Sequence, residues 1–131
     1  MSNLRNKSEI NLDSAELLHK NYMYPSVVHC SYYSCYQLMK HIWLTSMSKT
    51  DAELRLLTSS TKEGSHEVLI NQLYFYIKSR SQDFREFNNT IGQLKKLRRK
   101  ADYEDVQIDF SKSKNSIDLS KSTLSILRKC L

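Results

Sequence analysis

Apolar side chains recur along most of this chain at intervals of three and four residues, the spacing that places them on one face of an α-helix. In the clearest example, residues 25–43, one continuous stripe is formed by Val28, Tyr32, Cys35 or Tyr36, Met39, and Ile42 or Trp43. Pro25 suits the first turn of a helix, because proline has no N–H to leave unpaired there. We therefore expect a long helix over residues 25–43, and its broad aromatic stripe predicts a central place in the fold.

The segment before this helix predicts a polar tail followed by a shorter helix. Residues 1–11 are mostly polar, and we expect them to be loosely held. Asp13 and Glu16 have the three-residue spacing of a capping box, which marks the start of a helix. The first helix should therefore begin near Ser14 and end before Pro25, since the residue before a proline avoids the helical conformation. The side chains that we expect it to bury are Ala15, Leu18 and Tyr22.

Three further helices are predicted in the rest of the chain. Residues 45–65 are polar and turn-like, although 51–57 can add a short turn of helix. Ser65 can cap a third helix, and Thr90 with Gln93 forms a second capping-box pattern that opens a fourth. The apolar residues assigned to the core are Val68, Leu69, Leu73, Tyr76 and Ile77 in the third helix and Ile91, Leu94, Leu97 and Ala101 in the fourth.

The polar segment 81–89 separates the third and fourth helices, and a last helix is predicted over residues 117–129. Its serines and Thr123 are weak helix formers, so this helix should depend on docking against the others. Its core residues are expected to be Leu119, Leu124, Leu127 and Leu131.

Composition favours one all-α domain. The chain has 131 residues, 40% of them hydrophobic, which is enough for one core. Two glycines and one proline are too few for the turns of a β-sandwich. No run of apolar residues reaches the length of a membrane span, and the first residues are too polar for a signal peptide. We therefore expect one cytoplasmic domain over residues 1–131, a bundle of about five helices, with no membrane as partner.

Cysteines and histidines indicate neither a disulfide nor a metal site. Cys30, Cys35 and Cys130 lack CxxC spacing and are interpreted as reduced, inert thiols. His29 and His41 are too far apart in the sequence to form a metal-ligand motif, and there is no HExxH. His66, beside the Ser65 cap, should lie in the first turn of a helix, where a packing or capping role is preferred over a functional one. We expect no metal ion and no cofactor.

The most distinctive local feature is the charged run KKLRRKADYED, residues 95–105, in a chain of net charge +6. One interpretation is a solvated helix face on which Arg98 pairs with Asp102 four residues later. The other is an anion site for phosphate or nucleic acid, because arginine offers phosphate oxygens a two-pronged donor. Its basic side chains are Lys95, Lys96, Arg98 and Arg99. The aromatic residues 32, 33, 36, 43 and 74–76 are interpreted as core rather than as a platform for stacking bases.

Three segments, in this order, resemble the HEPN superfamily of small all-α proteins. They are SAELLHKNYMYPSVVHCSYYSCYQLMKHI at 14–42, SHEVL at 65–69 and LRRKADYED at 97–105. The resemblance implies an up-and-down bundle of four to five helices that commonly forms a homodimer. Many members are metal-independent ribonucleases, often toxins or parts of defence systems, with an Arg-x4–6-His motif. In that motif the arginine neutralises the phosphate while the histidine moves a proton from the 2′-OH.

This chain departs from the motif, since no histidine follows an arginine at that spacing. The nearest match pairs Arg98 with Tyr103, whose phenol, with a pKa near ~10, is a poor general base at neutral pH. The resemblance also covers members without the motif, which bind nucleotides or RNA or pair with nucleotidyltransferases. By position it carries over Arg98, Asp102 and Tyr103, and more weakly His66, in binding or structural roles.

We therefore expect a non-catalytic HEPN-like protein, a homodimer, that engages RNA, a nucleotide or a partner protein such as a nucleotidyltransferase, within a toxin–antitoxin or defence system. The phosphate-binding candidates are Lys95, Lys96, Arg98, Arg99, Asp102 and Tyr103. The first alternative is a metal-independent endoribonuclease toxin, with Arg98, Tyr103 and His66 as its catalytic candidates. The second is a scaffold or interaction module in which the basic run only keeps the bundle soluble.

Overall fold

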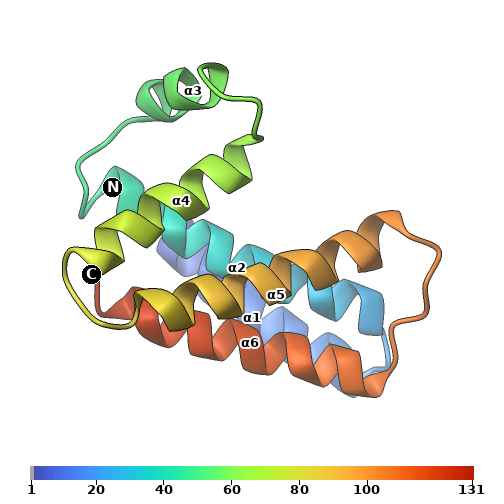
Figure 1. Ribbon diagram of the computed structural model, residues 1–131. Coiled ribbons are helices and arrows are strands. Elements are labelled where there is room, and N and C mark those ends of the chain that lie inside the picture. Colours follow the sequence, from blue (N-terminus) through green and yellow to red (C-terminus); the bar gives the residue numbers. More distant parts are fainter. Residues whose placement is uncertain (1) are drawn as a thin grey trace.

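The computed structural model describes residues 2–131, and these form six α-helices and no β-strand (Figure 1). The all-α prediction is confirmed, although the described residues hold one helix more than the bundle of about five expected from the sequence. The helices are α1 (Leu4–Lys20), α2 (Tyr24–Leu44), α3 (Asp51–Ser59), α4 (Ser65–Lys78), α5 (Phe84–Tyr103) and α6 (Phe110–Arg128).

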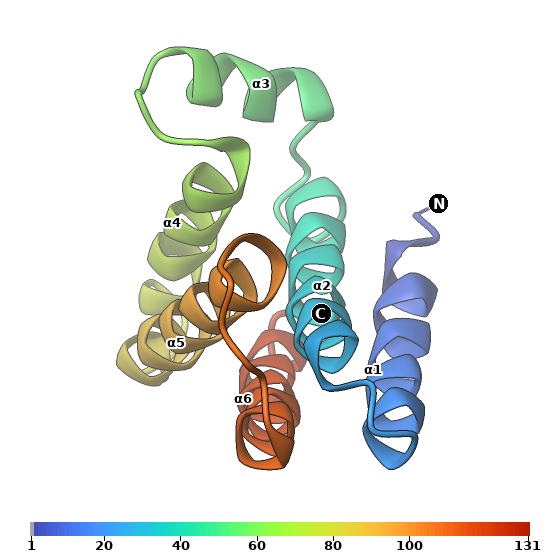
Figure 2. The same cartoon turned by 90° about the vertical axis from the view of Figure 1, so that its right-hand side faces the viewer.

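Helix α2 is the centre of the molecule, as its aromatic stripe predicted. It packs against α1, α4, α5 and α6, and it lies between them in Figure 2. Pro25 stands in its first turn. Burial of this stripe removes a large apolar surface from water, which is the main favourable contribution to folding. The stripe residues that are almost completely buried are Val28, Tyr32, Cys35, Met39, Ile42 and Trp43.

Helix α1 begins at Leu4, so the predicted loose segment is wrong over residues 4–11, while residue 1 lies outside the described residues. Asp13 lies inside the helix rather than at its cap. The reason is a buried polar contact with α2. The Ser8 hydroxyl donates to the Ser34 carbonyl at 2.6 Å, and the Ser34 hydroxyl donates to the Ser8 carbonyl at 2.9 Å. Ala15 is buried as expected, whereas Tyr22 lies in the turn after α1 and is 79% exposed.

Helix α5 begins at Phe84, so the predicted break at 81–89 is confirmed only over residues 81–83, and the predicted cap at Thr90 is wrong. Thr90 is buried in the middle of the helix, where its hydroxyl shares a 2.8 Å hydrogen bond with the hydroxyl of Thr123 on α6. Phe87, within the supposed break, is fully buried. The capping pattern was misleading because a buried threonine can be satisfied by another helix as well as by its own backbone.

Helix α6 begins at Phe110, earlier than predicted, and Asp109 caps it by accepting from the Lys112 N–H at 2.9 Å. Its packed face carries small polar residues, which gave no apolar signal in the sequence. Leu119 packs against the core from a half-buried position, whereas Leu131, expected in the core, is exposed. The fully buried polar residues of α6 are Ser113, Ser116, Ser120 and Thr123.

Helix α3 lies across the ends of α2 and α4 rather than within the bundle (Figure 2). The sequence allowed a short turn here, and the structure has a full helix capped by Thr50. Leu54 anchors it in the core. The Trp43 indole N–H donates to the Thr50 carbonyl at 2.9 Å, and Lys40 pairs with Asp51 at 2.7 Å.

Within residues 2–131, no helix has both the length and the apolar character needed to cross a bilayer. Cys30, Cys35 and Cys130 are free thiols, as the sequence predicted. Burial raises the pKa of the Cys35 thiol to about 12, so at neutral pH it is the unreactive protonated form.

Candidate phosphate-binding cleft

Side chains from α2, α4 and α5 converge on a cleft of about 290 Å³ at the amino end of α4. The first turn of α4 forms one wall, and the backbone N–H groups of such a turn have no partners within the helix. The basic face of α5 forms the opposite wall, and α2 contributes an aromatic floor. Residues that line the cleft are Tyr33, Gly64, Ser65, His66, Glu67, Lys95, Arg98, Arg99 and Tyr103.

Arg98 is the most unusual residue of the cleft, because its side chain is charged yet the residue is only 7% exposed. The guanidinium lies over the ring of Tyr32, 4.8 Å from its centroid. Its Nη1 reaches Asp102 Oδ2 at 3.5 Å and the Tyr103 hydroxyl at 3.4 Å, both long for charge-assisted hydrogen bonds. Its Nε is buried without a hydrogen-bond partner among residues 2–131. The buried charge of Arg98 is therefore only partly compensated by the protein.

His66 stands in the first turn of α4, as predicted, and packs against the same aromatic floor. Its ring stacks on that of Tyr36 at 4.1 Å, and its Nδ1 shares a 2.8 Å hydrogen bond with the Tyr32 hydroxyl. Burial, assisted by the nearby positive charges of Arg98 and Lys95, lowers the pKa of His66 to about 4. The imidazole is therefore neutral at pH 7. Arg98 and His66 contact the same side chain, Tyr32, from different helices.

The basic run divides between two faces of α5. Lys95 points into the cleft, where it pairs with Glu67 of α4. Burial, together with the charges of Arg99 and Arg98, lowers its pKa. Arg99 is exposed and also lines the cleft. Lys96 is exposed and lies instead on a groove beside Leu97, Lys100 and Asn115.

Four of the six phosphate-binding candidates therefore line the cleft, namely Lys95, Arg98, Arg99 and Tyr103. Asp102 contacts Arg98 as the sequence predicted, but the solvated-face interpretation is wrong for Arg98, which is buried. Lys96 does not reach the cleft. The predicted packing role of His66 is confirmed by its contacts with Tyr32 and Tyr36, and it also lines the cleft.

The sequence identified neither the aromatic residues of α2 (Tyr32, Tyr33 and Tyr36) nor His29 as site residues. Tyr32 is core, as interpreted, but Tyr33 and Tyr36 are half-buried and stack around His66. The Nδ1 of His29 lies 3.0 Å from Asp102 Oδ2, so Asp102 is shared between His29 and Arg98. Tyrosines on adjacent turns of one helix were the available signal, but local spacing does not say which helix packs on them.

Among residues 2–131, no group of three His, Cys, Asp or Glu side chains is placed to hold a metal ion. The cleft instead offers guanidinium and ammonium groups, hydroxyls and free backbone N–H groups, all of which are hydrogen-bond donors. Such a set recognises an anion, and phosphate is the common one that also matches a planar guanidinium.

Comparison of the sequence with models of known families and with curated proteins, and of the fold with solved structures, found no match. The resemblance to the HEPN superfamily therefore stays a prediction.

Proposed function

We propose that the protein binds a phosphate group of RNA or of a nucleotide in the cleft between α4 and α5. The observation that carries the proposal is the buried guanidinium of Arg98, which lines the cleft with an unpartnered Nε and only long contacts to Asp102 and Tyr103. A charge held in this way costs free energy in the unliganded protein. A phosphate placed against the part of the guanidinium that lines the cleft would compensate this charge.

The surroundings of Arg98 support phosphate over other anions. Arg99 adds positive charge to that of Arg98, whereas the charge of Lys95 is already compensated by its pair with Glu67. The first turn of α4 adds backbone N–H groups and the positive end of a helix dipole. Arginine and helix N-termini together are the usual phosphate-binding elements in proteins.

The proposal favours binding over catalysis because His66, the candidate general base, is a weak base. A histidine whose pKa is about 4 is neutral at pH 7 and therefore able to accept a proton, but it does so inefficiently. Tyr103 is 75% exposed and reaches Arg98 only through a long contact of 3.4 Å. The resemblance described above alone adds the rest of the proposal, which is a HEPN-like homodimer that pairs with a nucleotidyltransferase in a toxin–antitoxin or defence system.

The direct test is binding of a short single-stranded RNA, followed by fluorescence anisotropy over a series of salt concentrations. We expect affinity to fall as salt rises, because phosphate binding releases counterions. Arg99→Ala removes an exposed cation of the cleft and should reduce the slope of log affinity against log salt by about 1. Lys121→Ala is the charge-matched control, since Lys121 pairs with Glu16 on α1 away from the cleft. Absence of RNA binding at low salt would favour the scaffold alternative.

A metal-independent ribonuclease is the second candidate, and one observation favours it. Arg98 and His66 line one cleft and both contact Tyr32. Two helices therefore bring together an arginine and a histidine, although the chain has no Arg-x4–6-His motif. Incubation with total RNA in EDTA separates the two functions. Cleavage that is lost in Arg98→Lys and in His66→Asn, which can keep the hydrogen bond to Tyr32, would establish the nuclease. Intact RNA supports the binding function.

A further inference from the structure

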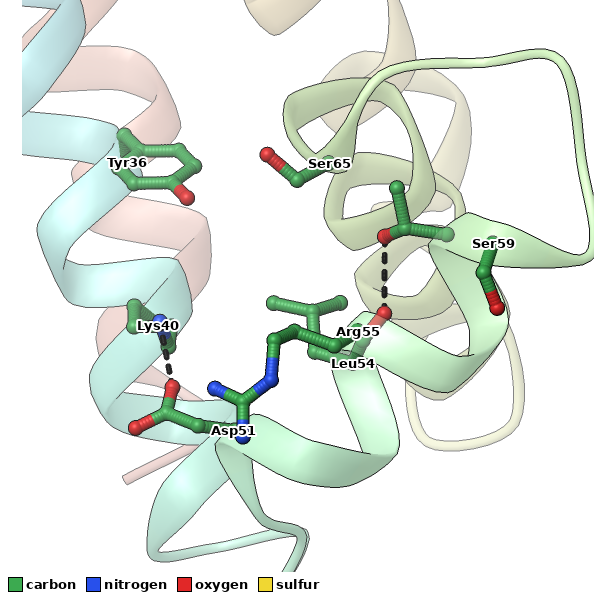
Figure 3. A pocket seen from close by; sticks show the side chains of 8 residues that line it. Tyr36, Lys40, Asp51, Leu54, Arg55, Ser59 and Ser65 are labelled. Atoms are coloured by element: carbon green, nitrogen blue, oxygen red, sulfur yellow. Dashed lines mark hydrogen bonds and ion pairs between the residues drawn. The ribbon is translucent and has the colours of Figure 1, made fainter.

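A second cavity, of about 470 Å³, lies between α2, α3 and α4 and adjoins the phosphate-binding cleft (Figure 3). The two spaces meet at Ser65, which lines both. They are also linked by an aromatic pair, because Tyr36 lines the second cavity and its ring stacks on His66 of the cleft at 4.1 Å. The two spaces are therefore neighbours, separated by Ser65 and by the Tyr36–His66 pair.

The second cavity combines apolar walls with hydrogen-bonding groups at its edge. Figure 3 shows Tyr36 and Ser65 facing one another from α2 and α4, with Leu54 between α3 and the core. Asp51 and Arg55 lie at the end formed by α3. The bond to Lys40 lowers the pKa of Asp51, so its carboxylate stays ionised and accepts hydrogen bonds. Ligand sites are typically built this way, from apolar surface and a few convergent polar groups.

The cavity is less positive than the cleft, with two cations and one carboxylate in its lining against three cations and one carboxylate. Lys40 is already paired with Asp51 at 2.7 Å, so its positive charge is compensated. Arg55 lies close enough to Asp51 to lower the pKa of that carboxyl as well. The part of a ligand that enters here should therefore be neutral, planar enough to lie against Tyr36 and Leu54, and able both to donate and to accept hydrogen bonds. A nucleobase meets these requirements.

We infer that the cavity beneath α3 holds the nucleobase of a nucleotide whose phosphate occupies the Arg98 cleft, with the sugar passing Ser65. The inference rests on the proposed function, which concerns the phosphate alone. The same chemistry is offered by a free mononucleotide and by one nucleotide of an RNA strand.

The chain contains its own reporter for this cavity. Trp43 is the single tryptophan, and its indole N–H donates to the carbonyl of Thr50, the N-cap of α3. We expect adenosine monophosphate to change Trp43 fluorescence and to bind about tenfold more tightly than inorganic phosphate, the gain expected from one base stacked on an aromatic wall. Equal affinities for phosphate and for the nucleotide would overturn the inference while leaving the proposed function intact.

Adjacent serines at the carboxyl end of α3, its last residue Ser59 and its C-cap Ser60, supply a matched pair of variants. Ser59 lines the cavity and Ser60 does not, and both hydroxyls donate at 2.8 Å to a carbonyl three residues earlier. Ser59→Phe should fill the cavity and remove the tenfold advantage of the nucleotide without changing phosphate affinity. Ser60→Phe should preserve both affinities. Nucleotide binding unchanged in Ser59→Phe would contradict the inference.

Two further titrations distinguish failure of the inference from failure of the proposed function. Arg99→Ala should weaken phosphate and nucleotide by the same factor, since it acts on the cleft alone. If neither ligand binds the wild-type protein, the proposed function itself is wrong. Displacement of bound nucleotide by a short RNA would identify an RNA strand as the source of the nucleotide, and its absence would identify the free mononucleotide.

Discussion

Arg98 lies over Tyr32 while its nearest carboxylate, that of Asp102, approaches only to 3.5 Å. Replacing a buried, poorly paired charge by an apolar side chain of similar length is often neutral or stabilising. We therefore predict that Arg98→Met changes the free energy of unfolding by less than about 1 kcal/mol, while phosphate affinity falls at least tenfold. Urea denaturation and phosphate titration measure the two effects. A loss of several kcal/mol with phosphate affinity retained would instead assign Arg98 a purely structural role.

The buried imidazole of His66 predicts that the stability of the protein depends on pH. Its pKa is lowered from 6.5 to about 4 in the folded protein, mainly by burial. As pH falls from 6.5 towards 4, the unfolded chain takes up a proton at this histidine and the folded protein does not, so stability should decrease over that window. A phosphate in the cleft favours the imidazolium and should raise the pKa of His66. An NMR titration of the ring should show a midpoint near 4 that rises with phosphate.

The control for this titration is His41, which follows Tyr32 on α2 and does not line the cleft. Its pKa is also lowered by burial, with a contribution from Arg5. Phosphate should leave the midpoint of His41 unchanged. A midpoint of His66 near 6.5 that does not respond to phosphate would contradict both the buried environment and the proposed cleft.

Helices were predicted well where burial is apolar and poorly where it is polar. The stripe of α2 and the apolar positions of α4 placed both helices almost to the residue. The starts of α1, α5 and α6 were missed because Ser8, Thr90 and Ser113 are buried there with partners on other helices. The sequence does not show whether a serine faces water or another helix. Its burial is fixed only by tertiary contacts.

The same limit applies to the candidate site. The basic run of α5 was recognised because its charges are adjacent in the sequence. Arg98 and His66 were both named as candidates, but their common contact with Tyr32 was not predicted, because the three residues lie on three different helices. A motif search along one helix cannot detect such an arrangement. The chain does lack the Arg-x4–6-His motif in its sequence, yet an arginine and a histidine from two different helices line the same cleft.

The docking of α1 on α2 provides a prediction for one element. Ser8 is buried against Ser34, and a leucine at this position would force the two helices apart, which costs about 1–3 kcal/mol in a packed interface. Ser8→Leu should lower the free energy of unfolding by that amount in urea denaturation. Glu9→Leu, at the neighbouring exposed position, should have little effect. Equal, small effects of both variants would mean that this segment is the loose tail expected from the sequence.

At the scale of the whole molecule, the cleft and the α3 cavity lie at one end of a bundle whose centre is α2. Their walls come from α2, α3, α4 and α5, so a ligand that bridges them ties α3 to the bundle. α3 is the helix with the smallest buried face, a single buried leucine, and should open most easily. Ligand binding should therefore stabilise both the global fold and, more strongly, this helix.

Both effects are measurable with one ligand. At a nucleotide concentration one hundred times its Kd, linkage stabilises the fold by about 2.7 kcal/mol, and each kcal/mol raises the Tm of a domain this size by about 4 °C. Amide hydrogen exchange should slow in α3 and in the first turn of α4, whereas inorganic phosphate should slow only the latter. Arg99→Ala should reduce the Tm shift with either ligand. A rise in Tm with exchange in α3 unchanged would place the nucleotide entirely in the Arg98 cleft.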